Sequence, residues 1–404
     1  MSNNQQRPPI LIAGAGLSSL LLAQSLLRSH IPFQIFERDA SLSFRGQGYR
    51  LRLSTEGLDA IEDVLGPDDF KRFYDICGKT GGSGFTLMNA VTGEEIEHTV
   101  PAKLNSRDSL IVGVARGEMR KFFLEGCEEY IQWTKKVVDY KDTPQGVKII
   151  FGDGSESVEG SMLIIGDGLK SKISKKLSEG KIKHFDTLAR GIHGQAPTPA
   201  FKGLTEGVFS LIDKSIEREA DEGEGEGETK LSVITNVRSK DMDDPTLQFG
   251  WTMAGSPGLI KAPNDDYTII GKQAADIAKS LTSKWHEKLK PLFEQMVEDE
   301  AAFWKITCSS PSGVPVWTNH PRITVIGDAV HSMTPAGGIG ANTAVRDSAL
   351  LGRLIREAGG YREGLTREYE EKMRVYASEA VAISYGLAEK QFGIRIDEET
   401  SPTV

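Results

Sequence analysis

The apolar positions near the N-terminus form two short runs with a helical pattern between them. Residues 10–13 are apolar and end in Gly14-Ala15-Gly16, residues 18–28 contain four consecutive apolar side chains, and residues 33–36 form a second apolar run. A strand, a helix and a strand within about 30 residues make a βαβ unit. The pattern therefore predicts the beginning of a Rossmann-type parallel sheet.

The middle of the chain changes to a pattern of strands. Residues 148–151 and 156–159 flank an Asp-Gly pair and predict a hairpin, and residues 162–165 form a short buried strand that ends in Gly166-Asp167-Gly168. Strand-like runs then follow without helices between them, at residues 191–194, 231–237, 247–253 and 267–270. This part of the chain predicts a separate, mostly antiparallel sheet.

The C-terminal third returns to strand and helix. A strand begins at Ile323 and ends at Gly327-Asp328, and residues 364–390 have the pattern of a long helix with paired charges four residues apart. We expect the apolar side of this helix to pack on the body of the protein. That side consists of Met373, Tyr376, Ala380, Ile383 and Leu387.

Composition limits the class of protein. The 404 residues are 39% hydrophobic and 26% charged, as in a globular chain of two or more domains. A net charge of −9 argues against nucleic acid as a partner. Three scattered cysteines indicate neither a disulfide framework nor a zinc site, and we expect a cytoplasmic protein. No apolar stretch approaches the roughly 18 residues of a membrane span, and no signal peptide is visible.

The first candidate site is the turn after residues 10–13. Gly14 permits a tight turn, Gly16 permits close approach of a diphosphate, and the helix that begins with Leu17 and Ser18 offers N–H groups and a positive partial charge. Glu37 lies 21 residues after Gly16, where a carboxylate accepts hydrogen bonds from ribose hydroxyls. The spacing predicts dinucleotide binding, and the alternative is a glycine turn with a surface glutamate. Ser19 replaces the usual third glycine, so we expect strand and helix to lie slightly further apart.

Two further Gly-Asp turns follow buried strands. Asp167-Gly168 and the basic helix start at Arg116 are by themselves ordinary structural sequences. Asp328 is followed by a glycine-rich stretch, residues 333–342, that permits close contact with a planar ligand. For His331 we favour a structural role, because the sequence shows no partner acid or nucleophile.

Taken together, these segments resemble the class A FAD-dependent monooxygenases, the aromatic hydroxylase superfamily. The most specific part is the segment 326–331 with Pro335, Gly338, Gly340, Ala341 and Asn342. Residues 45–51, followed by Gly57 and Leu58, are also similar to the family's segment beside the flavin. Ser174 departs from the family's pattern, which often has arginine there.

The resemblance implies an α/β fold with a Rossmann-type FAD-binding domain, a second, mostly antiparallel β-sheet substrate domain and a C-terminal helix. The FAD-binding domain would comprise residues 1–78, 107–183 and 304–360, and the substrate domain residues 79–106 and 184–303. Residues 361–404 would form the C-terminal helical segment.

The resemblance also assigns roles to residues. Glu37 and Arg38 would bind the adenosine ribose, Gly48 or Arg50 together with Arg116 would contact FAD, and Asp167 would serve the diphosphate and the nicotinamide donor. Asp328 would hold the ribityl side. The full set of expected cofactor-binding residues is Gly14, Gly16, Leu17, Ser18, Glu37, Arg38, Gly48, Arg50, Arg116, Asp167, Asp328, Pro335, Gly338, Gly340, Ala341 and Asn342.

The implied activity is insertion of one oxygen atom, by hydroxylation or epoxidation, into a small organic substrate of aromatic or secondary-metabolite type. NAD(P)H would reduce FAD, and O2 would form a flavin C4a-hydroperoxide. Arg190, on the first strand of the second domain, is the expected catalytic residue, and the alternative is a salt bridge at the domain edge. Phe249, Trp251 and Trp317 are candidates for the pocket wall.

Other functions remain open at this point. The same fold supports oxidation, reduction or halogenation, although no Trp-x-Trp-x-Ile-Pro segment is present for halogenation. A non-catalytic FAD-binding sensor is a third alternative. The sequence leaves undecided the substrate, the choice between NADH and NADPH, and whether the chain is a monomer or a homodimer. The acidic segment 219–228 is expected to be a solvated loop.

Overall fold

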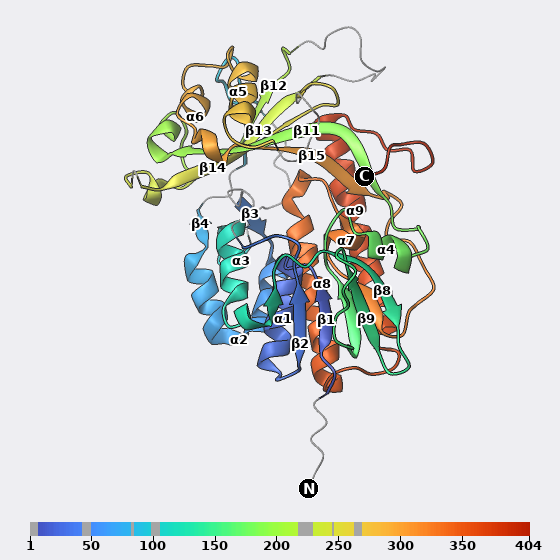
Figure 1. Cartoon of the computed structure of the whole chain (residues 1–404). Helices are drawn as coiled ribbons and strands as arrows, with labels where there is room; N and C mark the ends of the chain where they lie inside the picture. Colours follow the sequence, from blue (N-terminus) through green and yellow to red (C-terminus); the bar gives the residue numbers. More distant parts are fainter. Residues whose placement is uncertain are drawn as a thin grey trace.

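A parallel sheet of five strands forms the centre of the first domain (Figure 1). The computed structural model describes residues 7–42, 50–81, 85–97, 106–216, 229–244, 246–261 and 269–404. The strand order is β16-β10-β1-β2-β7, and every neighbouring pair is parallel. These strands are β1 (Ile10–Ala13), β2 (Phe33–Phe36), β7 (Ile131–Gln132), β10 (Met162–Ile165) and β16 (Ile323–Val325).

Helices cover this sheet, and this explains why its strands are uniformly apolar. All four residues of both β1 and β10 are buried, as expected for strands covered on both faces. Helices α1 and α8 pack against one another, and α2 packs on both (Figure 1). The helices of this domain are α1 (Leu17–Arg28), α2 (Thr55–Ile76), α3 (Arg116–Leu124), α4 (Lys172–Leu177), α7 (Asp328–His331) and α8 (Gly340–Ala358).

Two small sheets complete the first domain. Strand β6 (Ile111–Ala115) pairs with β3 (Arg50–Leu53) on one side and with β4 (Gly78–Thr80) on the other. Strands β8 (Val137–Asp142) and β9 (Val147–Phe151) form a separate antiparallel pair beside the main sheet. The β3-β6-β4 sheet lies between the parallel sheet and the second domain (Figure 1).

The second domain is a six-stranded sheet of order β15-β11-β14-β13-β12-β5. All its pairs are antiparallel except that between β12 and β5. Helices α5 (Lys272–Leu281) and α6 (Pro291–Glu294) cover one face, with Trp251, Trp285 and Phe293 in the core beneath them. The strands are β5 (Phe85–Asn89), β11 (His184–Pro197), β12 (Gly207–Asp213), β13 (Leu231–Val237), β14 (Gln248–Gly255) and β15 (Ala302–Ser309).

The structure departs from the expected elements at several places. Strand β15 continues the second sheet to Ser309, beyond the expected domain boundary at 303, because it pairs with β11 along its length. Strand β12 was not expected. Residues 156–160 return along β9 only through isolated bridges, and the full partner of β9 is the unexpected strand β8. Residues 267 and 268 of the expected strand 267–270, and the acidic segment 219–228, lie outside the described residues.

The C-terminal helix is α9 (Leu365–Phe392), close to the expected range. Met373 and Ala380 are buried, as predicted, and Tyr376 is partly buried. Ile383 is 48% exposed, so the prediction that it packs on the body was wrong. Leu387 is 41% exposed, yet its Cδ1 lies against Gly337 of the glycine-rich turn. In this part of α9 the buried positions are instead Val381, Ser384 and Ala388, which face the glycine-rich turn and β15.

Contact between α1 and β10 uses a glycine that the motif analysis did not consider. A Cβ atom at Gly166 would lie 2.3 Å from the Ser19 hydroxyl oxygen, so only glycine fits opposite Ser19. The serine in the place of the third motif glycine is thus accommodated by the glycine that follows the neighbouring strand β10. The hydroxyl of Ser19 is fully buried and has no hydrogen-bond partner among the described residues.

This packing predicts opposite effects of two alanine substitutions. Ser19→Ala removes an unsatisfied buried hydroxyl, and we expect the free energy of unfolding to rise by about 1 kcal/mol. Gly166→Ala forces a methyl group against Ser19, and we expect a loss of about 1–3 kcal/mol. Denaturant unfolding of the purified variants measures both changes.

A matched glycine-to-alanine control is Gly386→Ala. This residue lies in α9 with no atom within 4 Å of an added Cβ, so the substitution is expected to stabilise the helix by up to about 1 kcal/mol. Equal effects of alanine at positions 166 and 386 would contradict the packing argument.

Candidate functional site

The turn after β1 is held against the turn after β10 by direct backbone contact. Gly14 has φ +90°, and a Cβ atom there would lie 2.5 Å from the Gly166 carbonyl oxygen and 2.7 Å from the Asp167 Cα. A side chain at position 14 would therefore force the two turns apart. Gly16 precedes α1 in extended conformation, so the N-terminal N–H groups of the helix, including those of Leu17 and Ser18, face this edge of the sheet.

Glu37 is fixed at the rim of this turn. One of its carboxylate oxygens accepts the Ala15 backbone N–H at 2.7 Å, and the other accepts that of Asp39 at 3.0 Å. Arg38 is exposed beside it, with its Nε 3.9 Å from the Asp39 carboxylate. The glycine turn and the acid at the end of β2 thus form one hydrogen-bonded unit, a geometry suited to a ribose.

Asp167 has an atom that needs a partner. Its Oδ1 is buried and makes no hydrogen bond within the described part of the chain. Burial raises the pKa of Asp167 to about 6, with the Glu37 charge adding to the rise and Arg38 opposing it. Buried polar atoms are normally hydrogen-bonded, so an unsatisfied acid beside a glycine turn fits a ligand rich in hydroxyl or phosphate groups.

Asp328 begins α7 at the end of β16. Its side chain is accessible, yet the surrounding protein raises the pKa of its carboxyl by desolvation. The charges of His331 and Arg116 oppose this rise, which brings the helix start at Arg116 to the same region. The ends of β1, β10 and β16 therefore bring Gly14, Asp167 and Asp328 to one edge of the sheet.

A buried charge network supports this edge from below. The Asp347 carboxylate on α8 contacts His331 Nε2 at 2.7 Å, accepts the Gly327 N–H at 2.7 Å and accepts the Tyr376 hydroxyl at 2.7 Å. Both His331 and Asp347 are buried, and the neighbouring carboxylate raises the pKa of His331 against desolvation. The sequence argument that His331 has no partner acid was wrong, because Asp347 lies 16 residues away on the next long helix.

The glycine-rich turn before α8 is held in place by an asparagine. Asn342 accepts the Ser54 N–H at 2.8 Å and donates to the Arg52 and Gly338 carbonyls at 2.9 and 2.8 Å. Its amide rests where Gly57 has no side chain, since a Cβ there would be 2.1 Å from the amide oxygen. The side chain of Asn342 is thus committed to the protein.

The glycines of this turn carry no side chains that would keep a planar ligand away from the backbone. Gly337 and Gly338 adopt φ of +78° and +61°, and Pro335 precedes them. Gly340 and Ala341 then open α8, which has 19 residues. Peptide groups and the positive end of a helix are the features that the turn offers to a flavin ring.

Of the remaining expected residues one is not described and one lies at the domain border, and one contact was missed. Gly48 lies outside the described residues. Arg50 lies against Gly78 and the Gly113 carbonyl, at the border with the second domain. Arg120, which no motif identified, is buried and donates to the Ala15 carbonyl at 2.9 Å, so it supports the glycine turn.

On the second sheet, the expected pocket residues occupy the cores. Phe249 and Trp251 are buried beneath α5 and α6, and Trp317 is buried in the first domain, so all three have the core position that is more common for such aromatics than a place in a pocket wall. Arg190 makes a two-pronged ion pair with Asp186 at 2.7 and 3.1 Å. This pair is the salt bridge at the domain edge that was the alternative to a catalytic role.

The opposite face of the second sheet carries polar and aromatic groups that sequence reasoning missed. His193 and Trp304 stack with ring centroids 4.8 Å apart, and His193 Nδ1 is 3.0 Å from the Thr252 hydroxyl. Desolvation lowers the pKa of His193 to about 3, so the imidazole is neutral. On this face Ala254 clusters with Ala336 of the glycine-rich turn. Successive side chains of a strand point to opposite faces of a sheet. The residues that alternate with the core residues of β11 and β14 were therefore the sequence signal for these positions.

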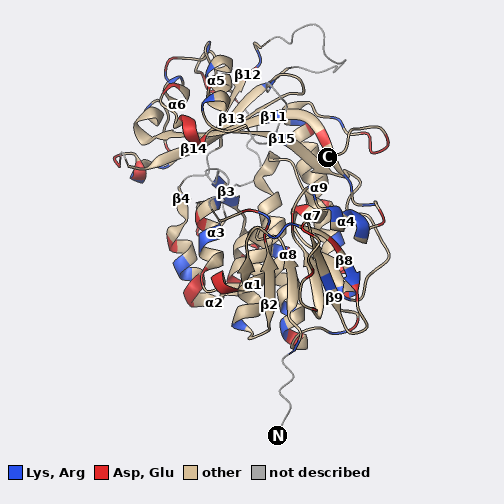
Figure 2. Ribbon diagram, in the orientation of Figure 1, with Lys and Arg blue, Asp and Glu red and all other residues tan. Residues whose placement is uncertain are grey.

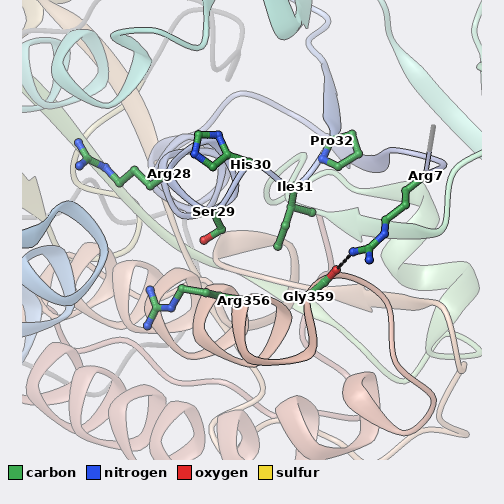
Figure 3. A pocket seen from close by; sticks show the side chains of 8 residues that line it. All are labelled: Arg7, Arg28, Ser29, His30, Ile31, Pro32, Arg356 and Gly359. Atoms are coloured by element: carbon green, nitrogen blue, oxygen red, sulfur yellow. Dashed lines mark hydrogen bonds between the residues drawn. The ribbon is translucent and has the colours of Figure 1, made fainter. Parts of the chain in front are cut away.

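A hollow of about 470 Å³ lies away from this edge (Figure 3). Arg28 and Ser29 at the end of α1 and Arg356 near the end of α8 line it, together with Arg7. It therefore opens at the opposite end of α1 from the glycine turn. Arg7, Arg28 and Arg356 already contact the Gly359 carbonyl, Asp69 and Asp63, so the hollow is not the functional site.

The described residues also show what the site does not contain. They include no helix that is long and apolar enough to cross a membrane. Over the same ranges, no group of three or more histidine, cysteine or acidic residues is arranged to hold a metal ion.

Comparison with known proteins agrees with the geometry. Residues 130–384 match the family described as FAD binding domain. A dual O-methyltransferase/FAD-dependent monooxygenase of Cercospora beticola is 29% identical over 95% of this chain and 46% of its own length. An FAD-dependent monooxygenase of Trichoderma harzianum is 26% identical over 86% of this chain and 82% of its own length. This chain spans less than half the length of the dual-function relatives it matches.

Solved structures share the whole fold. A protein of Photorhabdus luminescens described as an FAD-containing monooxygenase superposes with a TM-score of 0.73 and 25% identity, over 95% of this chain and 98% of that chain. Klebsiella pneumoniae HpxO, solved with FAD and uric acid, gives a TM-score of 0.73 at 18% identity, over 95% and 89% of the two chains. The family match covers more than half of the residues, and the expected α/β fold with a second β-sheet domain is confirmed. The chain therefore belongs to the FAD binding domain family, within the class A flavoprotein monooxygenases.

Proposed function

We propose that this chain is an FAD-dependent monooxygenase that uses NAD(P)H and O2 to add one oxygen atom to a small aromatic substrate. The observation that carries the proposal is the meeting of three strand ends at one edge. The Gly14 turn, the unsatisfied carboxylate oxygen of Asp167 and the accessible Asp328 face that edge together.

These residues fit the parts of FAD in order along the edge. Glu37, held by two backbone N–H groups, is placed for the adenosine ribose, and the start of α1 is placed for the diphosphate. Asp328 suits the hydroxyls of a ribityl chain, and the backbone from Gly338 to Asn342 suits the ring. Bound FAD would supply the electron transfer and oxygen activation, and the protein supplies position and a dry pocket.

The second sheet supports a substrate site over this ring position. Its open face carries the stacked His193–Trp304 pair beside Thr252, and it packs on the glycine-rich turn through Ala254 and Ala336. A neutral imidazole and a flat indole favour an aromatic substrate by stacking, and they exclude water without adding charge. The named activities of the relatives support the same reaction class.

Absorbance and turnover measurements test the proposal. The purified protein is expected to carry a flavin spectrum, and one compound of an indolic, phenolic and polyketide panel is expected to accelerate NAD(P)H oxidation and to gain one oxygen atom by mass. Bound FAD without any accelerated turnover would favour another flavin reaction or a sensor. A protein that takes up no FAD would contradict the cofactor assignment itself.

The raised pKa of Asp167 predicts how FAD affinity depends on pH. Below about pH 6 the carboxyl is neutral and does not repel the diphosphate, whereas above it the charge does. Because the bound anion raises this pKa further, the Kd for FAD should increase by up to about tenfold per pH unit as the pH rises through 6. Fluorescence titration of apoprotein with FAD measures it.

Asp167→Asn should flatten this profile, since the amide stays neutral. Asp153→Asn is the control, because Asp153 is an exposed acid in the β9 turn with hydrogen bonds to Ser155 and should leave the profile unchanged. A wild-type Kd that does not vary between pH 5 and about pH 8 would reject the role of Asp167.

We further propose that Arg190 acts on the substrate side, and a pair of variants separates this role from its salt bridge. Arg190→Ala is expected to lower substrate-dependent turnover roughly tenfold or more with FAD content intact. Asp186→Asn breaks the same ion pair but keeps the cation, so it should retain most of the activity. Equal losses in both variants, or unchanged turnover in Arg190→Ala, would leave Arg190 with the structural role alone.

A further inference from the structure

Two arginines from different domains meet at the border between the domains. Arg50 begins β3, which is marked blue at this border in Figure 2, and Arg238 directly follows β13 of the second sheet. Both lie against Gly78: a Cβ atom there would be 2.7 Å from Arg50 Nη2 and 3.2 Å from Arg238 Nε. The two guanidinium groups therefore share the space that the missing side chain leaves.

These guanidinium groups have more donors than acceptors. Each carries five N–H donors. Within the described residues, Arg50 makes one hydrogen bond, from Nη2 to the Gly113 carbonyl at 3.4 Å, and Arg238 donates from Nε to the Asp241 carboxylate. The side chain of Arg238 is only 8% exposed. Its Nη1 is fully buried and has no acceptor in the described ranges.

The local charge is also unbalanced. Burial and the positive charge of Arg238 lower the pKa of Arg50 to about 10, whereas Asp241 opposes this shift. Among the described residues, Asp241 is the carboxylate that acts on both cations, and its ion pair is with Arg238. Arg238 also stacks over the Phe249 ring at 4.8 Å, which weakly compensates its charge. Burying two like charges is costly unless an anion joins them.

This arginine pair lies next to the cofactor edge. Arg52 is on the same face of β3 as Arg50, and it donates to the Gly337 carbonyl of the glycine-rich turn at 3.2 Å. Opposite Arg50 on β6 is Ala115, the residue before Arg116, whose charge reaches Asp328. The pair thus lies near the glycine-rich turn, at the border between the first domain and the second sheet.

We propose that Arg50 and Arg238 form a subsite for an anionic group of the substrate, the carboxylate of an aromatic acid. A planar carboxylate accepts two parallel N–H bonds from a guanidinium and would neutralise the excess charge. The reading of this anion as substrate rests on the proposed function. The geometry itself requires only an anion at the border of the two domains.

Calorimetry with two matched probes tests the subsite. Salicylate carries a carboxylate, and salicylamide is its neutral analogue of nearly equal shape. FAD-loaded wild-type protein is expected to bind salicylate more tightly than salicylamide. Arg238→Gln and Arg50→Gln should each weaken salicylate binding by roughly ten- to a hundredfold and leave salicylamide binding unchanged. Arg238→Lys should recover part of the loss.

Lys79→Gln is the matched control for a general loss of positive charge. Lys79 follows Gly78 on β4, but its ammonium group packs on Tyr74 and donates to backbone carbonyls, so its removal should leave salicylate affinity unchanged. If Arg238→Gln fails to fold, as judged by FAD content and circular dichroism, Arg50→Gln carries the test, because Arg50 makes only one long hydrogen bond.

Several outcomes would overturn the subsite. For the wild type, these outcomes are equal affinity for the two probes or no salicylate binding at millimolar concentration. For the variants, they are an equal loss of affinity for both probes in Arg50→Gln and Arg238→Gln, or a loss of salicylate affinity of the same size in Lys79→Gln. A rise in the KM for NADPH with salicylate affinity unchanged would assign the pair to the donor's phosphate instead. Salicylate binding through Arg238 in a protein that oxidises no NAD(P)H would reject the monooxygenase activity and keep the anion subsite.

Discussion

The cofactor edge depends on the contact between the turns that follow β1 and β10. These strands are neighbours in the sheet, and the backbone at Gly14 approaches the Gly166 carbonyl so closely that no side chain fits between them. The same approach brings the Asp167 Cα against Gly14, and Gly166 in turn gives Ser19 its space. One backbone packing constraint thus positions the turn after β1, the acid Asp167 and the helix α1. It also makes Gly14 and Gly166 interdependent.

A second layer of interactions holds this edge from the side of α8. Asp347 binds the Gly327 N–H and His331, and Asn342 ties the glycine-rich turn to β3. A buried carboxylate is tolerated only when it is paired and fully hydrogen-bonded, and Asp347 meets this condition with three partners. Because α8 both supports Gly327 and begins at the glycine-rich turn, the positions of Asp328 and of the proposed ring site are coupled through a single helix.

Local sequence patterns were sufficient for the strongly periodic elements and insufficient for the small sheets of the first domain and for the site's support. The βαβ unit, β13 and the C-terminal helix appear in the structure near their expected bounds, because hydrophobic runs and glycine turns are local signals. The partners Gly57–Asn342, Ser19–Gly166 and His331–Asp347 depend on contacts between distant segments, so no spacing rule gives them. Strand β12 was missed although Gly207 begins its apolar run and Asp213 ends it. The order of the second sheet, including the parallel β5, follows from tertiary pairing alone.

The second domain shows why aromatic residues are poor guides to a pocket. Trp251 and Phe249 fill the core beneath α5 and α6. Thr252, the next residue on β14, and its partner His193 on β11 point to the opposite face of the sheet. On that face, stacking of His193 on Trp304 over Gly191 requires glycine, since a Cβ atom there would lie 2.5 Å from the indole. The neutral, aromatic wall on this face is complementary in chemistry to the cationic pair of Arg50 and Arg238, of which Arg238 stacks on Phe249. A flat ring bearing one negative charge would suit both. The ring would stack on the neutral His193 and on Trp304. The carboxylate would meet Arg238, whose Nη1 is the one buried guanidinium nitrogen at the domain border without a partner among the described residues.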